Sequence, residues 1–307
     1  MKLKGLPKIV YLNAKQDSVQ NQLMIEHFDH YGIKDYIRHE KKYTTQVKDS
    51  SSINWNDILS DDYSDDGACR FVTGSFDHSY LLENELALTL DNYDAIVNWY
   101  ENTDDEVCII MDDIVRLHTS NYWMFDWEYA YKRLPYNWDC IQLFVNSASQ
   151  KIPMNLHPWQ REHRSTRCYM ISRLFAKKIK RFHYPDGKFK LHYRCRDKSI
   201  PANDYGNIET TLFNLGNTYL LPLFNLYENF LQYDSEYDVR LCRDKLSSDA
   251  IDYWWSQVAG NYSLDEALKF LVGVVEQNTP QARIAYKGES EEYKKTNTEL
   301  YLSLIHI

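Results

Sequence analysis

The sequence feature that most constrains the fold is an apolar run that ends at two adjacent carboxylates. Residues 107–111, Val-Cys-Ile-Ile-Met, lead directly into Asp112 and Asp113. The run is rich in β-branched residues and short for a helix, so it predicts a central strand of a parallel sheet. In open α/β sheets, ligands bind at the carboxyl ends of the strands. The two acids are therefore candidate ligands of a divalent cation that bridges nucleotide phosphates, with a cap of the following turn as the structural alternative.

The elements before this run fit an α/β sheet. Residues 7–13 predict a first strand, residues 17–31 a helix and residues 33–39 a second strand, which is the βαβ opening of doubly wound folds. Residues 44–67 are polar and acidic and predict a long surface loop. Residues 84–100 carry apolar side chains at spacings of three and four, which predicts a helix directly before the acidic strand.

Composition limits the class of protein. The 307 residues are 44% hydrophobic, enough for a large core, and carry a formal net charge of −9, which disfavours nucleic-acid binding by the surface as a whole. We expect no membrane span, because no apolar run reaches the roughly 18 residues that cross a bilayer. The N-terminal residues lack the apolar core of a signal peptide, and the six cysteines form no CxxC pair. These features predict a cytoplasmic protein with reduced thiols.

Several short blocks of the sequence follow one another in a characteristic order. They are Ile9-Val10-Tyr11-Leu12-Asn13 with Asp17, Glu85 to Leu90, Met111-Asp112-Asp113-Ile114, Trp138 to Leu143, Cys168 to Lys178, Pro201 to Tyr205, and Tyr219 to Phe224. In content and order these blocks resemble glycosyltransferase family 25, the lipooligosaccharide and procollagen galactosyltransferase type. The resemblance spans residues 8–225, and the block at 168–178 is its most specific part.

The resemblance implies a fold and an activity. The implied fold is an α/β fold of GT-A type, a single nucleotide-binding mixed sheet flanked by helices over residues 1–230, with a small helical C-terminal extension over residues 231–307. The implied activity is transfer of a hexosyl or pentosyl group from a nucleoside-diphosphate sugar, with a UDP-sugar as the expected donor, to an acceptor hydroxyl. Mn²⁺ or Mg²⁺ would be the cofactor. The implied metal ligands are Asp112 and Asp113, and the implied nucleotide contacts are Asn13, Asp17 and Glu85.

The chemistry of such a reaction points to further residues. Departure of a nucleoside diphosphate builds negative charge, which a cation held by Asp112 and Asp113 would stabilise, so Asp113 is a candidate catalytic residue. The acceptor hydroxyl needs a base or an orienting carboxylate. Asp204, in a polar turn between apolar segments, is the candidate, with an Asx turn as the alternative. The candidate to bind the diphosphate is a basic loop that contains Arg161, His163, Arg164 and Arg167. The alternative is that these residues form a solvated surface loop with no ligand.

The sequence departs from the family pattern at three places. The arginines that follow the Asn13 and Asp17 positions are missing, Met111 stands where the family usually has Glu, and Asp91-Asn92 replaces a Ser-His pair. A binding protein that kept the sheet and lost catalysis is therefore one alternative. A nucleotidyltransferase or phosphohydrolase that uses the same acids is another.

The acceptor is open between two classes. Residues 177–198 hold nine Lys or Arg against two Asp, interleaved with Phe and Tyr, a combination that binds a nucleic-acid backbone and stacks bases. One hypothesis is therefore a DNA-modifying glycosyltransferase that acts on hydroxymethylated bases. The other acceptor is a saccharide or another hydroxyl compound, in which case the segment is a β-hairpin that turns at residues 185–187. High Tyr usage with only ten Gly is associated with viral proteins, for which the location would be the host cytoplasm.

The C-terminal part predicts helices. Residues 246–259 and 263–277 each carry an apolar face, and Ser263 with Glu266 forms a capping-box pattern. Residues 289–307 are charged and then apolar. They are a candidate surface for oligomer formation.

Overall fold

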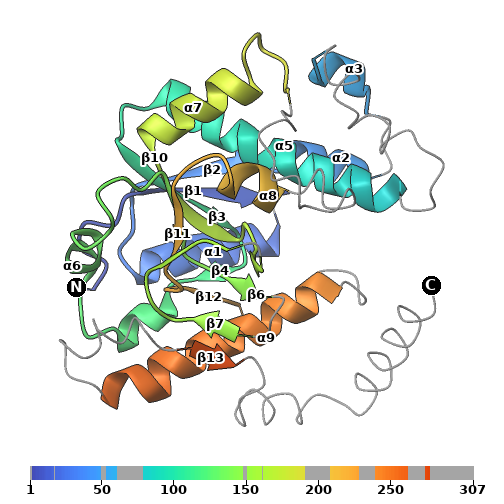
Figure 1. The fold of residues 1–307 in the computed structure, drawn as a ribbon. Coiled ribbons are helices and arrows are strands. Elements are labelled where there is room, and N and C mark those ends of the chain that lie inside the picture. The colour runs from blue at the N-terminus through green and yellow to red at the C-terminus, as the bar shows by residue number, and fades with distance from the viewer. Residues whose placement is uncertain are drawn as a thin grey trace, which may run out of the picture.

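A central mixed sheet organises the protein. The computed structural model describes residues 2–16, 18–49, 53–60, 79–147, 151–160, 162–190, 208–227, 239–261 and 274–276. Over these residues the main sheet has seven strands in the order β2-β1-β3-β10-β5-β11-β8, with helices on either side (Figure 1). The predicted α/β class with a mixed sheet and flanking helices is confirmed.

The sheet has a parallel half and a mixed half. The parallel half contains β1 (Lys8–Asn13), β2 (Tyr36–Glu40) and β3 (Val107–Asp112). The next strand, β10 (Cys168–Ser172), runs antiparallel to both of its neighbours, β3 and β5 (Cys140–Gln142). Beyond β5 lie β11 (Thr218–Leu220), parallel to β5, and β8 (His157–Pro158), antiparallel to β11.

Three two-stranded pairs accompany the main sheet, and all are antiparallel. They are β4 (Val115–Arg116) with β12 (Asn225–Leu226), β6 (Asn146–Ser147) with β9 (His163–Arg164), and β7 (Lys151–Pro153) with β13 (Val274–Glu276).

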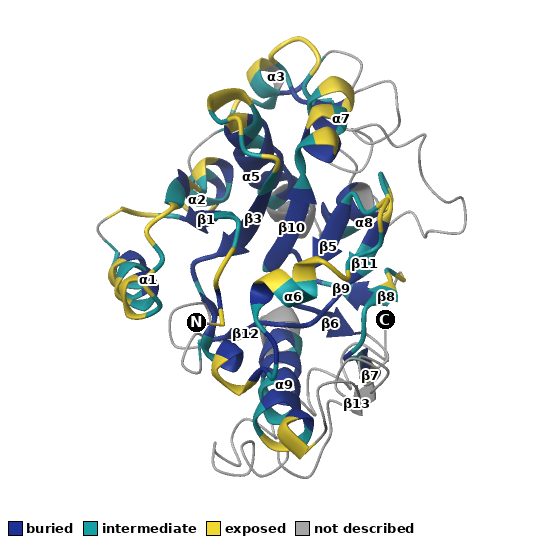
Figure 2. Ribbon diagram, turned by 90° about the vertical axis from the view of Figure 1, so that its left-hand side faces the viewer, coloured by how far each residue is buried: buried dark blue, intermediate teal, exposed yellow. Residues whose placement is uncertain are grey.

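Helices cover both faces of the sheet, and the central strands β1, β3, β10 and β5 are buried (Figure 2). Alternate residues of a strand point to opposite faces, so Ile9 and Tyr11 join one core while Val10 and Leu12 join the other. The first core includes side chains of α1 (Val19–His30), α6 (Trp127–Tyr131), α9 (Val239–Tyr253) and the π turn η6 (Trp254–Val258) that leads into η7 (Ala259–Asn261). It also includes Leu117 and Trp123, which flank the 3₁₀ turn η2 (His118–Tyr122). The second core includes side chains of α2 (Lys42–Lys48), α3 (Trp55–Ile58), α5 (Ser79–Asn102), α7 (Arg173–His183) and α8 (Ile208–Phe213).

Local sequence explains the first βαβ unit. Both faces of β1 are covered, which is why its sequence is continuously apolar. Ser18 caps α1, because its Oγ accepts a 3.1 Å hydrogen bond from the N–H of Asn21. The helix ends before Gly32, whose φ of +67° is a conformation that glycine adopts without strain. The predicted strand, helix and helix end are confirmed here.

Two predicted segments differ in the structure. The loop predicted over residues 44–67 begins inside α2 (Lys42–Lys48), and its residues 55–58 form α3. In the described part of the basic segment, residues 177–190, the predicted hairpin strand is wrong, because residues 177–183 lie in α7. The predicted turn at 185–187 agrees, and Gly187 there has φ +77°. The period of α7 places Phe175, Ala176 and Ile179 on one buried face, so helical packing determines this segment.

The described C-terminal helix belongs to the same core as the sheet. Trp255 of η6 packs edge-on against Trp123 and Phe125, and its Nε1 donates a 2.9 Å hydrogen bond to the carbonyl oxygen of Pro222. Residues 274–276 form β13, whereas a helix was predicted to extend to residue 277. The predicted contact surface at 289–307 lies outside the described residues. Among the helices that the structure describes, none is long and apolar enough to cross a bilayer.

Candidate functional site

The strand order of the sheet reverses between β1 and β3. From β1 the chain crosses through α1 to β2 on one side, and then returns through α5 to form β3 on the other side of β1. α1 and α5 contribute to opposite cores. In open α/β sheets, the crevice at such a reversal, beyond the carboxyl ends of the strands, is where ligands bind. Leu12 of β1 lies beside Asp112 of β3, so Asn13 and Asp113 come together at this crevice.

Asn13 binds Asp113 at the end of the two strands. The Nδ2 of Asn13 donates a 2.6 Å hydrogen bond to Oδ2 of Asp113, and the Oδ1 of Asn13 accepts one of 3.1 Å from Nε of Arg38. Asn13, Asp112 and Asp113 are 1%, 4% and 7% exposed. Because burying a carboxylate without partners is costly, the groups around Asp112 and Asp113 determine whether each is ionised.

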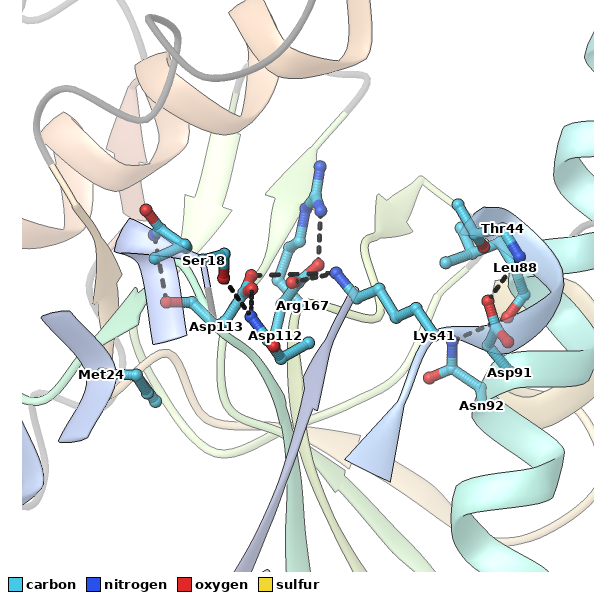
Figure 3. Close-up of polar contacts among 12 residues, drawn as sticks. Ser18, Met24, Lys41, Thr44, Leu88, Asp91, Asn92, Asp112, Asp113 and Arg167 are labelled. Atoms are coloured by element: carbon cyan, nitrogen blue, oxygen red, sulfur yellow. Dashed lines mark hydrogen bonds and ion pairs between the residues drawn. The ribbon is translucent and has the colours of Figure 1, made fainter. Parts of the chain in front are cut away.

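Two basic side chains contact Asp112, one at each carboxylate oxygen (Figure 3). The ammonium of Lys41 donates to Oδ1 of Asp112 and lies 3.8 Å from Oδ1 of Asp113. The Nη1 of Arg167 lies 2.5 Å from Oδ2 of Asp112. Lys41 directly follows β2, and Arg167 directly precedes β10. The ends of four neighbouring strands therefore meet at one charged cluster.

Arg167 also connects the strand ends to helix α9. Its Nε donates a 3.0 Å hydrogen bond to Oδ2 of Asp244, and Oδ1 of Asp244 accepts one of 2.9 Å from Nδ2 of Asn146. Burial acts to lower the pKa of Arg167, but Asp112 and Asp244 outweigh burial and raise it, so the guanidinium stays charged. The C-terminal helix therefore contributes an acid to this cluster.

The backbone around Lys41 is held from two sides. Its N–H donates a 3.0 Å hydrogen bond to the carbonyl oxygen of Asn13. The carboxylate of Asp91, in α5, accepts from the N–H groups of Tyr43 at 2.8 Å and Thr44 at 2.9 Å (Figure 3). These bonds fasten the start of α2 to α5, and they fix the point from which the Lys41 side chain extends.

The two adjacent carboxylates differ in their affinity for protons. Burial acts to raise the pKa of Asp112, but Lys41 and Arg167 outweigh burial and hold this pKa below its usual range. For Asp113, burial outweighs the opposing effect of Lys41, the charge of Asp112 adds to it, and the pKa lies above its usual range. Asp112 is therefore the firmly ionised member of the pair.

A cavity of about 450 Å³ adjoins the contact between Asn13 and Arg38. It is lined by residues that follow β1, by the end of β2 and by α2, namely Ala14, Lys15, Gln16, Ser18, Arg38, Glu40 and Thr45. Its size is within the range of small-molecule sites. Most of the lining residues carry polar or charged groups, which can hydrogen-bond to hydroxyl groups and ring nitrogens of a ligand.

The carboxylate pair fits a divalent cation. Asp112 and Asp113 offer the hard oxygen atoms that Mg²⁺ and Mn²⁺ prefer, and the ammonium of Lys41 already lies close to the Oδ1 atoms of both. In the described parts of the chain no third Asp, Glu, His or Cys completes a three-residue metal group. Such a cation would therefore be held by two carboxylates and by oxygen atoms of a bound phosphate ligand, a common arrangement for Mg²⁺.

The structure brings together three of the residues that the sequence singled out as ligands: Asn13, Asp112 and Asp113. For Glu85 only the backbone is described, within α5. Arg164 lies in β9 and pairs with Asn146, and the basic-loop residue that reaches the carboxylates is Arg167. Three further candidates, which remain predictions, lie outside the described residues: Asp17, Arg161 and Asp204.

Sequence reasoning missed Lys41, Arg38 and Asp244. Lys41 could have been found, because it follows a predicted strand that neighbours β1, and side chains at the carboxyl ends of parallel strands share one edge. For Arg38, which lies in β2, no sequence signal relates it to Asn13, 25 residues earlier. For Asp244, no sequence signal relates an acid in α9 to an arginine 77 residues earlier.

Comparison with known proteins gives little. No family model matches the chain, and no curated protein sequence matches it. Among solved structures, it is similar to the protein of "Crystal Structure of A197 from STIV", with 9% identity and a TM-score of 0.35, over 71% of this chain and 83% of that one.

Proposed function

We propose that the protein is a glycosyltransferase with a GT-A type sheet that moves a sugar from a nucleoside-diphosphate sugar to an acceptor hydroxyl. The observation that carries the proposal is the position of Asp112 and Asp113, two buried carboxylates at the crevice where the strand order reverses, near a cavity lined by Arg38 and other polar residues. The resemblance of residues 111–114 to the acidic block of glycosyltransferase family 25 supports the same reading.

The donor would lie along the ends of the parallel strands. Its nucleoside would lie in the cavity beside Arg38, and its diphosphate would then extend towards Lys41 and Arg167. Both side chains are N–H donors with a positive charge, which is the chemistry that binds phosphate oxygens. Asn13 would orient Asp113 through the 2.6 Å hydrogen bond.

The reaction would break the bond between the anomeric carbon of the sugar and the β-phosphate oxygen, and would form a bond from that carbon to the acceptor oxygen. Negative charge develops on the departing diphosphate, and the positive charges of Lys41 and Arg167 would stabilise it. A divalent cation held by Asp112 and Asp113 would supply further charge stabilisation. The proton of the acceptor hydroxyl would pass to a base, for which Asp204 stays the predicted residue.

The acceptor is proposed to be a saccharide or another hydroxyl compound. Two of the basic residues behind the DNA hypothesis, Lys178 and Lys180 of α7, form ion pairs with Asp139 at 3.2 Å and Glu101 at 2.7 Å. Part of the positive charge in residues 177–190 is therefore balanced by neighbouring acids. A DNA acceptor is tested as a separate arm of the experiment.

The experiment is donor turnover with identification of the product. The full-length protein is incubated with MnCl₂ and a panel of nucleotide-sugars, with either simple saccharides or duplex DNA that carries hydroxymethylated bases. Release of a nucleoside diphosphate is the expected result. Release of pyrophosphate or phosphate would instead indicate nucleotidyl transfer or phosphohydrolysis, and donor binding without turnover would indicate the non-catalytic alternative. Stimulation by the modified DNA alone would identify DNA as the acceptor.

A further inference from the structure

Lys41 lies where a cation is expected between the two carboxylates. Its ammonium contacts Oδ1 of Asp112 and lies 3.8 Å from Oδ1 of Asp113, and its side chain is 13% exposed. The two oxygens of this pair that a divalent cation would use thus already face a positive charge. No spacing rule relates Lys41 to Asp112, because 71 residues separate them.

We propose that Lys41 is a built-in counter-ion that a metal and diphosphate ligand displaces together. In the ligand-free protein the ammonium neutralises Asp112 and Asp113. When the ligand binds, the ammonium leaves the carboxylates and contacts the phosphate oxygens. This proposal rests on the proposed function, in which a nucleoside diphosphate binds at this crevice.

The structure allows Lys41 to move while its neighbours stay fixed. The N–H of Lys41 donates a hydrogen bond to the carbonyl oxygen of Asn13, and Asp91 accepts hydrogen bonds from the N–H groups of Tyr43 and Thr44. The backbone at Lys41 is therefore held in place. The side chain beyond it has four carbon atoms and rotates easily. Arg167, in contrast, is held by both Asp112 and Asp244, so it keeps its place on the opposite oxygen of Asp112.

The charge balance among Lys41, Asp112 and Asp113 favours joint binding of the metal and the diphosphate. A divalent cation that bound alone would take Asp112 and Asp113 from Lys41 and leave a largely buried ammonium without an anion, which is unfavourable. A diphosphate brings the negative charge that Lys41 then contacts. Binding of the metal and binding of the diphosphate therefore favour each other, and by linkage the effect is the same in both directions.

The test is Mn²⁺ binding to the full-length protein, measured from the electron paramagnetic resonance signal of unbound Mn²⁺, with and without UDP or inorganic pyrophosphate. For the unaltered protein we expect weak binding of Mn²⁺ alone and at least about tenfold tighter binding with UDP or pyrophosphate, a typical size for coupling between two ligands. Lys41→Met removes the charge and keeps most of the side-chain length. Mn²⁺ alone should bind to this variant at least about tenfold more tightly than to the unaltered protein, and UDP should increase the Mn²⁺ affinity by a smaller factor.

Several variants keep the test interpretable. Lys41→Gln should behave like Lys41→Met, and Lys41→Arg, which retains the charge, should behave like the unaltered protein. Lys42→Met is the matched control, because Lys42 is exposed and its ammonium lies over the ring of Tyr43, 5.2 Å from the centroid. Asp112→Asn should abolish binding of Mn²⁺ in every background.

The outcomes separate this proposal from the proposed function. If Lys41→Met and Lys41→Gln leave the affinity for Mn²⁺ alone unchanged or weaker, the counter-ion role is wrong, regardless of the effect of UDP on Mn²⁺ binding. If the variants bind Mn²⁺ more tightly and pyrophosphate couples to Mn²⁺ but UDP does not, the counter-ion role stands and the nucleotide part of the proposed function is wrong. If neither the unaltered protein nor the variants bind Mn²⁺, both are contradicted.

Discussion

The side-chain amide of Asn13 donates a 2.6 Å hydrogen bond to the carboxylate of Asp113, across the ends of the two parallel strands at which the strand order reverses. This contact ties the residue after β3 to the last residue of β1. Since Asn13 also accepts from Arg38, it connects the carboxylate pair to the wall of the adjoining cavity.

Replacement of Asn13 should therefore affect both stability and ligand binding. Asn13→Ala leaves the buried carboxylate of Asp113 without this donor and the half-buried guanidinium of Arg38 without this acceptor, and an unsatisfied buried polar group typically costs about 1–3 kcal/mol. Urea denaturation would measure the loss, and UDP affinity should fall in the same variant. Asn102→Ala, at an exposed position of α5, is the control and should change stability by less than about 0.5 kcal/mol. Equal losses for the two variants would argue against the contact.

Removal of Arg167 should be strongly destabilising. Arg167→Met leaves Asp112 and Asp244 buried with fewer cationic partners, and breaking a buried ion pair in this way costs about 3–5 kcal/mol. The loss should be smaller in the Asp244→Asn background, because one of the two carboxylates is then uncharged. A double-mutant cycle by denaturant unfolding measures this coupling, and strictly additive losses would show that Arg167 and Asp244 act independently.

Acid should destabilise the protein in part through His27. Burial, with the charge of Arg116 second, lowers the pKa of His27 to about 3, and its Nε2 accepts a 2.9 Å hydrogen bond from the N–H of Leu117. The unfolded chain takes up this proton near pH 6.5, so the free energy of unfolding is unaffected by His27 above that pH. It falls as the pH drops towards 3, with a loss of about 2 kcal/mol by pH 5. Urea titrations at pH 7.5 and 5 measure the effect. His27→Gln should lose correspondingly less stability between these pH values, and an unchanged pH dependence would refute the assignment.

Gly216 should not tolerate a side chain. A Cβ atom there would lie 2.5 Å from Oδ2 of Asp139 and 2.7 Å from Cε2 of Phe175. Gly216→Ala should cost about 1–3 kcal/mol, as overpacking of a core typically does. Gly260 is the matched control, because a Cβ at Gly260 has no neighbour within 4 Å. Thermal unfolding of both alanine variants gives the comparison, and the same melting temperature for both would contradict the packing around Gly216.

The parts of the fold that the sequence predicted are those with a local signal. β1 and β3 are buried on both faces, so each is a continuous apolar run, and α1 is delimited by Ser18 and Gly32. The carboxylates were found for the same reason, since they directly follow such a run.

The parts that the sequence did not predict depend on distant residues. α2 has a weak helical sequence, rich in Thr and Tyr, and its first N–H groups are bonded to Asp91, 48 residues from Tyr43. The basic segment was assigned to a hairpin from its turn residues, whereas its packing against α5 favours α7. The charged cluster likewise combines Lys41, Arg167 and Asp244 from three separate regions, and no spacing rule connects them.

Under the proposed function, Asp112 and Asp113 act on a nucleoside-diphosphate sugar. The most direct measurement is the rate of nucleoside diphosphate release from the preferred donor, with Mn²⁺ present, for the unaltered protein, Asp112→Asn, Asp113→Asn and the control Asp104→Asn, whose side chain is fully exposed. We predict at least a hundredfold loss for the two site variants, typical of removing one transition-state charge contact, and an unchanged rate for the control. Turnover that persists in both site variants would contradict the account.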